Sequence, residues 1–286
     1  MWLIYAFGAA LFAGITAILA KVGIKNVDSN VATAIRTIII LIFSWLMVFV
    51  VGSFETLKEV SNQTCIFLIL SGLATGGSWL CYFKALQLGD VNKVTPIDKS
   101  STVLTMLLAY VILGEALTVP KIIGLIAIAI GTYLMITKKL GIEKKVEGKG
   151  WLFYAILSSI CASLTSILGK IGINGIESNL GTAIRTIVVL IMAWVVVFIT
   201  EKQGEIKNID TKSWCFICLS GITTGLSWLC YYKALQQGQA SIVVPIDKLS
   251  IVVTIAFSYI FLKEKLSLKA FLGFIMIIVG TLVLLL

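Results

Sequence analysis

Charged residues are scarce in this sequence of 286 residues, and histidine is absent. Only 13% of the residues are charged, whereas a water-soluble domain carries about a quarter. Hydrophobic residues make up 59% of the chain, and the mean hydropathy is +1.03. Because so little polar surface cannot cover this much apolar surface in water, we expect a chain that folds in a lipid bilayer.

The absence of histidine also excludes several kinds of site. The chain cannot form a His-Glu-x-x-His metalloprotease motif, and Cys215-Phe-Ile-Cys218 has no second cysteine pair to complete a zinc site. Neither Pro-Ile-Asp-Lys segment has the Gly-x-Gly-Asp pattern of an intramembrane aspartyl protease. We therefore expect no enzyme activity, no bound metal and no cofactor.

The formal net charge of +9 comes from lysines that lie between apolar runs rather than in one patch. This distribution is unlike a nucleic-acid-binding surface. In a membrane protein, lysine-rich loops mark the cytoplasmic side and contact anionic lipid headgroups.

An internal duplication is the strongest signal in the sequence. Residues 2–137 align with residues 151–286 without a gap, and about two in five positions are identical. Ser78-Trp-Leu-Cys-Tyr82, for example, recurs as Ser227-Trp-Leu-Cys-Tyr231. The alignment predicts a first repeat at 1–137, a charged linker at 138–150 and a second repeat at 151–286.

Each repeat contains five apolar stretches, each near the roughly 20 residues that a helix needs to cross a bilayer. They lack the alternation of barrel strands. The sequence therefore predicts an all-α membrane protein with ten transmembrane helices. The expected spans are 2–20, 31–51, 65–86, 92–113 and 121–137 in the first repeat, and 151–169, 180–200, 214–235, 241–262 and 269–286 in the second.

The odd number of helices per repeat has a topological consequence. The second repeat must enter the membrane from the side opposite to the first, so the two form an inverted pair about an axis in the membrane plane. Such a pair gives a transporter two nearly equivalent states, open to opposite sides of the membrane.

Several recurring residues together resemble a known family. Their pattern is similar to the EamA-type branch of the drug/metabolite transporter superfamily, and the similarity covers the whole chain twice. The residues that carry it are Lys21 and Lys170, Arg36 and Arg185, the turn Gly114-Glu115-Ala-Leu117 with its counterpart Lys263-Glu264-Lys-Leu266, and Gly124, Gly131, Gly273 and Gly280.

The resemblance implies a ten-helix transporter fold with a central cavity that carries metabolites, amino acids or drugs. Each half also resembles short five-helix relatives that work in pairs, so the resemblance implies a fused pair. We expect a multi-pass protein of the cell (inner or plasma) membrane that acts as a secondary carrier or exporter by alternating access. A channel or a lipid scramblase is the alternative. The sequence does not define the oligomeric state.

Ionisable groups inside hydrocarbon cost about 2.5–3.5 kcal/mol each on insertion scales and persist where they face a cavity or a partner. Five such positions recur in both repeats, and we interpret them as substrate-binding candidates. They are Lys21 and Lys170, Arg36 and Arg185, Lys84 and Lys233, Asp98 and Asp247, and Lys99 and Lys248. Because basic groups outnumber acids, we expect an anionic or zwitterionic substrate. Asp98 and Asp247 are the candidate carriers of a coupling proton.

Polar and aromatic residues on the third predicted helix of each repeat complete the candidate site. Helical spacing places the polar ones on one face, which either lines a cavity or packs against another helix. The tryptophans either stack on a substrate or lie at the membrane interface. These candidates are Ser78, Trp79 and Tyr82 with Ser227, Trp228 and Tyr231. Pro96 and Pro245 precede the aspartates and predict interrupted helices beside them.

The orientation of the chain is the first testable prediction. Loops after odd-numbered spans hold most of the lysines, which predicts both termini outside, whereas the family resemblance implies both inside. Reporter enzymes fused after Leu286 distinguish the two. A fusion active only outside the cytoplasm supports the lysine count, and a cytoplasmic readout overturns it.

Overall fold

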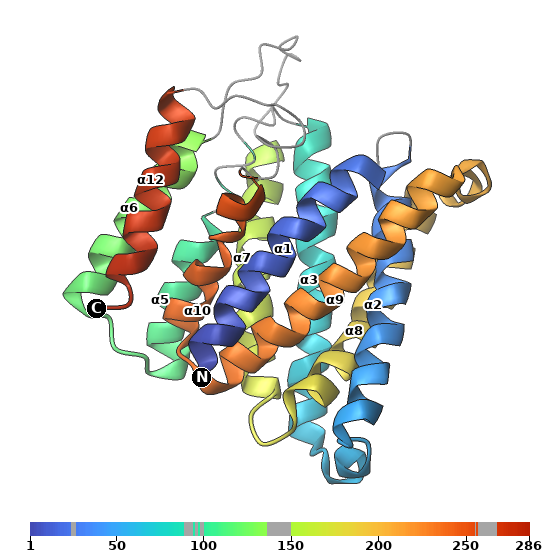
Figure 1. Ribbon diagram of the computed structural model, residues 1–286, viewed down its shortest axis with the longest axis horizontal. Helices are drawn as coiled ribbons and strands as arrows, with labels where there is room; N and C mark the ends of the chain where they lie inside the picture. Colours follow the sequence, from blue (N-terminus) through green and yellow to red (C-terminus); the bar gives the residue numbers. More distant parts are fainter. Residues whose placement is uncertain are drawn as a thin grey trace. The chain divides into compact units, whose positions relative to one another are not determined.

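The computed structural model describes residues 1–23, 27–88, 94, 97, 100–135, 150–254, 256 and 268–286. Regular secondary structure within these residues is entirely helical (Figure 1). The α-helices are α1 (Trp2–Gly23), α2 (Ser29–Val51), α3 (Asn62–Leu88), α5 (Ser101–Leu113), α6 (Val119–Met135), α7 (Gly150–Gly172), α8 (Ser178–Ile199), α9 (Thr211–Gln237), α10 (Ala240–Asp247) and α12 (Leu268–Val283). Short 3₁₀ helices, η1 (Glu55–Glu59) and η2 (Gln203–Asn208), follow α2 and α8.

Six of the described helices are long and apolar enough to cross a membrane. They are α1, α2, α3, α7, α8 and α9. The helices α5, α6 and α12 are apolar but shorter in their described parts. The prediction of an all-α protein with several membrane spans is therefore confirmed, whereas the number of ten spans stays a prediction.

The chain divides into two compact units, each built from both repeats. Unit 1 comprises residues 1–73, 168–238 and 250–264, and unit 2 comprises residues 74–167, 239–249 and 265–286. Unit 1 thus holds α1, α2, α8 and α9, and unit 2 holds α5, α6, α10 and α12. The helices α3 and α7 contribute residues to both.

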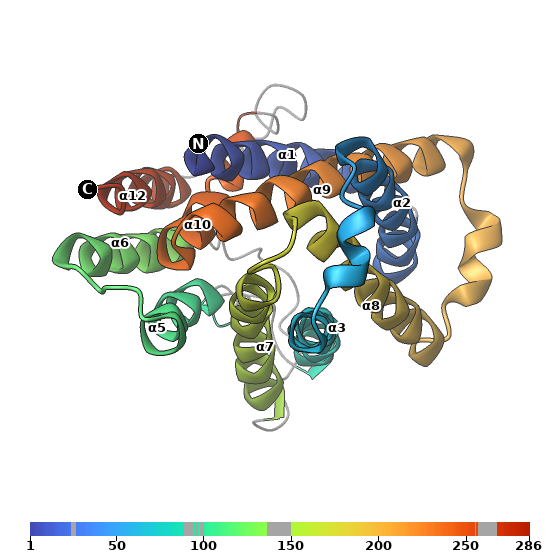
Figure 2. The ribbon, with the colours of Figure 1, turned by 90° about the horizontal axis from the view of Figure 1, so that it is seen from below.

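In unit 1, α1 lies along α9, as the views in Figures 1 and 2 agree. The Ser227 hydroxyl donates a hydrogen bond to the Ala9 carbonyl at 2.9 Å. At the other end of the pair, a Cβ on Gly23 would lie 3.1 Å from the backbone nitrogen of Ile217. Residue numbers rise along α1 from Ala9 to Gly23 while those of the contacted residues on α9 fall from Ser227 to Ile217. The two helices therefore run antiparallel.

Unit 2 contains the matching contact with the repeats exchanged. The Ser78 hydroxyl on α3 donates to the Ser158 carbonyl on α7 at 3.2 Å. In the internal alignment Ser78 corresponds to Ser227, and Ser158 corresponds to Ala9. The first helix of each repeat therefore packs on the third helix of the other repeat.

A second exchanged pair lies within unit 1 and involves glycines that admit a neighbouring backbone. A Cβ on Gly72 of α3 would lie 2.7 Å from Cβ of Val188 on α8. A Cβ on Gly221 of α9 would lie 2.9 Å from Cβ of Ile39 on α2. Since Gly72 corresponds to Gly221 and Ile39 to Val188, these contacts are also counterparts of each other.

The helices α6 and α12 form the closest glycine-lined contact of unit 2 and lie side by side in Figure 2. A Cβ on Gly124 would lie 2.6 Å from the Gly280 carbonyl oxygen, and one on Gly131 would lie 2.6 Å from that of Gly273. Small residues let helices in lipid approach this closely, which supplies van der Waals contact. This packing explains the Gly-rich last helix of each repeat.

Acidic residues begin the second and third helices of unit 1 in the way expected of helix N-caps. Asp28 accepts hydrogen bonds from the N–H groups of Asn30 and Val31, and Glu177 caps α8 in the same way. At the start of α9, hydrogen bonds from the Ser213 hydroxyl and N–H hold the pKa of the Asp210 carboxyl below its ordinary value. This cap therefore stabilises α9 at neutral pH, and its contribution is lost as the pH falls through the pKa that the carboxyl has in the folded protein.

The α6–α12 contact predicts the effect of one methyl group. We expect Gly131→Ala to lower the melting temperature of the detergent-purified protein, because overpacking against a backbone carbonyl costs about 1–3 kcal/mol. Gly204→Ala is the matched control, since a Cβ there would meet nothing within 4 Å. Equal melting of both variants would show that α6 and α12 are not in this close contact.

Candidate functional site

Arg185 on α8 is the most completely enclosed of the candidate basic residues whose side chains are described. Its side chain is 2% exposed, and its Nε donates to the Ser71 hydroxyl at 2.9 Å. The guanidinium carbon lies 5.1 Å from the ring centre of Trp228 and 4.9 Å from that of Tyr232. Cation–π contacts at such distances stabilise a desolvated guanidinium by about 2 kcal/mol.

Arg36 on α2, the counterpart of Arg185, has a different environment. Its Nη2 donates to the Thr224 hydroxyl on α9 at 2.7 Å. Its Nε is buried and has no hydrogen-bond partner among the residues that the structure describes. The side chain as a whole keeps partial exposure. The two arginines occupy equivalent positions in the two repeats, but they make different contacts.

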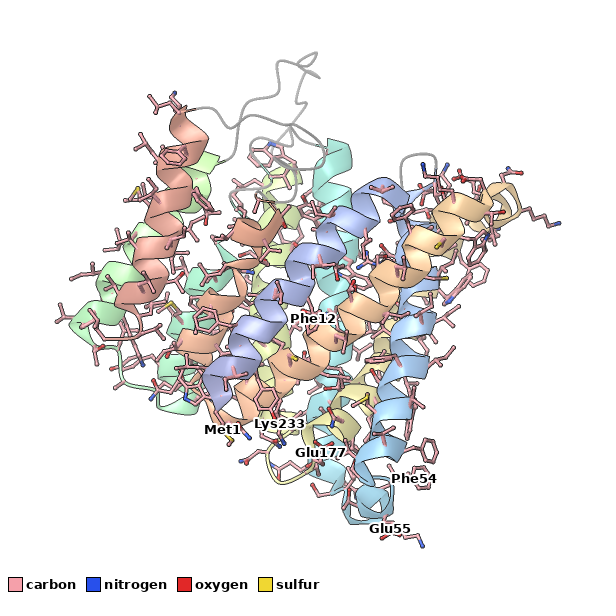
Figure 3. All side chains as sticks on the ribbon, in the orientation of Figure 1. Met1, Phe12, Phe54, Glu55, Glu177 and Lys233 are labelled. Atoms are coloured by element: carbon pink, nitrogen blue, oxygen red, sulfur yellow. The ribbon has the colours of Figure 1, made fainter. Side chains whose placement is uncertain are left out.

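Two candidate lysines lie at helix ends within unit 1. Lys170 donates to the carbonyl of Gly238, the residue that caps the C-terminus of α9, at 2.5 Å. Lys233 lies 3.7 Å from the carboxylate of Glu177, the N-cap of α8, and Figure 3 shows the two side chains next to each other. These contacts favour a structural role at helix ends for both lysines. Lys21 lies in α1, and its side chain is outside the described part.

The polar and aromatic candidates of the third helices divide between packing and partial exposure. Ser78 and Ser227 are buried, and each donates to a carbonyl of a neighbouring helix, which favours the packing interpretation. Trp79, Tyr82, Trp228 and Tyr231 are each half-buried. Tyr82 packs against a cluster of unit 2 residues made of Ala85, Val94 and Ala155, and Lys84 on the same helix is exposed. Substrate binding by these residues stays a prediction.

The fourth span of the second repeat is interrupted beside Asp247. The helix α10 contains Pro245 and ends at Asp247, and the N–H of Lys248 bonds to the Pro245 carbonyl at 3.0 Å, in the tighter 3₁₀ manner. Helical geometry resumes at residues 250–254. Asp247 and Lys248 are both half-buried. Their counterparts Asp98 and Lys99, with Pro96, lie outside the described residues.

A matching hydrogen bond precedes α5 in the first repeat. The N–H of Ser100 bonds to the Ile97 carbonyl at 3.1 Å, and the corresponding bond in the second repeat joins Leu249 to Ile246 at 2.9 Å. This bond therefore recurs in both repeats. In the second repeat the interruption lies beside Asp247, at the kind of position where transporters often bind substrates or ions.

Glu115, the acidic residue of the recurring turn, was not among the sequence candidates. Within unit 2 its carboxylate accepts hydrogen bonds from the N–H groups of Ala240 and Ser241 at 2.6 and 2.8 Å, and its side chain is 8% exposed. It therefore caps the N-terminus of α10, where a negative charge is favourable. Retention of glutamate in both turns, as Glu115 and Glu264, was the signal that pointed to it.

Lys121 is a second buried charge at this end of α10, and its side chain is 5% exposed. Its Nζ donates to Gln239 Oε1 at 2.6 Å, to the Ala116 carbonyl at 2.8 Å and to the Ser241 hydroxyl at 3.1 Å. The counterpart of Lys121 is Ala270, so only one repeat supplies this lysine.

The comparison with protein families explains the pattern of recurring residues. A family model described as the EamA-like transporter family matches the chain twice, over residues 1–137 and 149–286. The chain belongs to the EamA-like transporter family. With its apolar helices, this membership makes it a multi-pass membrane protein of a transporter family.

Two relatives agree with the EamA assignment. An "uncharacterized transporter in cobO 3'region" from a Sinorhizobium species is 42% identical over 136 residues, which are 48% of this chain and 96% of the relative. That relative is therefore about as long as one repeat. An "uncharacterized transporter" from Archaeoglobus fulgidus is 26% identical over 280 residues, 97% of this chain and 95% of its own.

A protein of known crystal structure has the same fold as this EamA protein. The TM-score is 0.82 at 16% sequence identity, over 99% of this chain and 97% of the other. At this identity the likeness concerns the fold alone.

Glu115 generates a stability prediction. We expect Glu115→Ala to lower the melting temperature, because two backbone N–H groups of α10 lose their acceptor at a cost of about 1–3 kcal/mol each. Glu115→Gln keeps one acceptor oxygen, so its melting temperature should lie between those of the wild type and Glu115→Ala. The control is Glu55→Ala, at an exposed position of η1. If Glu115→Ala melts like the control, the carboxylate does not hold α10.

Proposed function

We propose that this EamA-family protein is a secondary carrier or exporter in the cell (inner or plasma) membrane. It moves a small anionic or zwitterionic metabolite by alternating access between two inverted repeats. The observation that carries the proposal is the exchange of equivalent contacts. Ser78 with Ser158 and Ser227 with Ala9 are one contact made twice, with the repeats swapped.

Such exchange supports an inverted pair, because a two-fold axis converts each contact into its counterpart. The antiparallel course of α6 and α12 supports the same symmetry. Their closest approaches join Gly124 to Gly280 and Gly131 to Gly273, so each glycine meets the counterpart of the other rather than its own. A two-fold symmetric frame gives the conformations open to the two sides similar free energies.

The proposed substrate charge rests on the recurring basic residues. Arg36 and Arg185 lie inside apolar helices of unit 1, and the structure describes no ion pair of Arg36 with a carboxylate. A buried cation without a carboxylate partner favours an anionic ligand. The half-length relative supports the further view that the chain is a fused pair of five-helix units.

Uptake into proteoliposomes tests the carrier mechanism. We expect flux that saturates with substrate concentration and is accelerated by substrate on the opposite side, because each turnover requires the protein to change state. The substrate is first found by a thermal-shift screen of metabolites, since a ligand that binds the folded state raises its apparent stability. Flux that does not saturate would indicate a channel, and lipid transfer between leaflets would indicate a scramblase.

The aspartates beside the interrupted helices generate a transport prediction. We expect Asp98→Asn and Asp247→Asn each to reduce proton-driven transport by about tenfold or more while leaving insertion intact, because an amide cannot carry the proton. Asp210→Asn is the control, since asparagine remains a good N-cap at the start of α9. Wild-type transport by both variants would remove the two aspartates from the mechanism.

A further inference from the structure

Three helices of unit 1 bring one arginine and three threonine hydroxyls together. Arg36 on α2 donates from Nη2 to the Thr224 hydroxyl on α9 at 2.7 Å. The Thr16 hydroxyl on α1 lies 2.8 Å from that of Thr223 and 3.4 Å from that of Thr224. We call these four residues the Arg36 cluster. Hydroxyl and guanidinium groups are both donors that suit an oxyanion.

The donors of Arg36 exceed the acceptors that the protein supplies. A guanidinium has five N–H bonds. In the described part of the chain, its one hydrogen bond goes to Thr224, its Nε has no partner, and it forms no ion pair with a carboxylate. Burial of such a group is unfavourable unless an anion compensates the charge. Arg36 and Thr223 both keep partial exposure, so the edge of the cluster is accessible although the Arg36 Nε is buried.

The counterpart arginine has different surroundings. Arg185 is 2% exposed, its Nε donates to Ser71, and its guanidinium lies against Trp228 and Tyr232. Tyr232 in turn hydrogen-bonds to Ser71. Two aromatic rings therefore cover the guanidinium of Arg185, and this cover is what distinguishes it from Arg36, since each arginine has one buried nitrogen without a hydrogen bond to the described residues.

The two repeats have also diverged at the residues that make this difference. Ser220, the counterpart of Ser71, donates to the Ile217 carbonyl at 2.8 Å, and the hydrogen bond that the structure describes for Arg36 goes to Thr224 instead of Ser220. Thr223, which extends the Arg36 cluster, corresponds to Ala74 in the first repeat. A hydroxyl that only one repeat has is not explained by the exchanged packing contacts, because those contacts recur in both.

We propose that the Arg36 cluster is the receptor for a carboxylate group of the transported metabolite, an inference that rests on the proposed carrier function. The free Nε–H and an Nη–H of a guanidinium point in parallel and match the two oxygens of a planar carboxylate. Beside them, the Thr16 hydroxyl is available to donate when it accepts from Thr223. The single hydrogen of the Thr223 hydroxyl goes either to Thr16 or to the Leu219 and Ser220 carbonyls of its own helix. Arg185 is a positioning residue that fixes α8 against α3 and α9.

Chemical modification of the purified full-length protein tests this assignment without a transport assay. Phenylglyoxal reacts with accessible guanidinium groups, and mass spectrometry reports the modified fraction of each arginine. We expect Arg36 to react and Arg185 to stay unmodified. Acetate should protect Arg36 in a concentration-dependent way, whereas acetamide, or chloride at equal ionic strength, should not. Arg36 that does not react, or that reacts equally in acetate and chloride, overturns the proposal.

Two variants and a second anion sharpen the test. Thr223→Ala should weaken protection by acetate about tenfold, because the Thr16 hydroxyl loses the hydrogen bond that orients it toward the bound anion. Thr165→Ala, which removes the Thr16 counterpart in unit 2, should leave protection unchanged, and melting temperatures verify that both variants fold. If inorganic phosphate protects Arg36 better than acetate does, the site prefers a tetrahedral oxyanion. This result would overturn the assignment of a carboxylate. If acetate protects Arg36 but no metabolite is transported, the carrier function fails while the anion site stands.

Discussion

The core of a bilayer contains no water, so each hydrogen-bonding group there needs a partner within the protein. In this chain the partner repeatedly comes from the other repeat. The Ser78 hydroxyl reaches a carbonyl of α7, and the Ser227 hydroxyl reaches a carbonyl of α1. Each compact unit therefore contains helices of both repeats. One repeat alone would lack these partners.

The spans could be predicted because their signal is local. Apolar runs of the right length recur twice, and α1, α2, α7, α8 and α9 begin and end within a few residues of the expected bounds. The pairing of helices could not be predicted in the same way. Periodicity shows which face of a helix is apolar, whereas the identity of the covering helix depends on residues far apart in the sequence, such as Gly124 and Gly280.

The interruption beside Asp247 could be predicted from the sequence only in part. Proline cannot donate a backbone hydrogen bond, so Pro245 was expected to disturb the helix near that aspartate. The structure adds that α10 ends two residues after the proline and that its first turn is capped by Glu115. The sequence did not predict this cap because Glu115 lies in a turn. The helix that its carboxylate contacts is far away in the sequence and is identified only in the folded chain.

Recurrence of a residue in both repeats does not by itself identify a substrate-binding residue. A residue retained in both repeats can serve the symmetric frame, as Ser78 and Ser227 do when each donates to a carbonyl of a neighbouring helix. A substrate without two-fold symmetry requires unequal surroundings. Unequal surroundings arise where the same residue meets different neighbours, as Arg36 and Arg185 do, or where one repeat has a hydroxyl that the other lacks, as at Thr223. The symmetric contacts thus supply a frame with two similar states, and the departures from symmetry are where recognition of one ligand has room to develop.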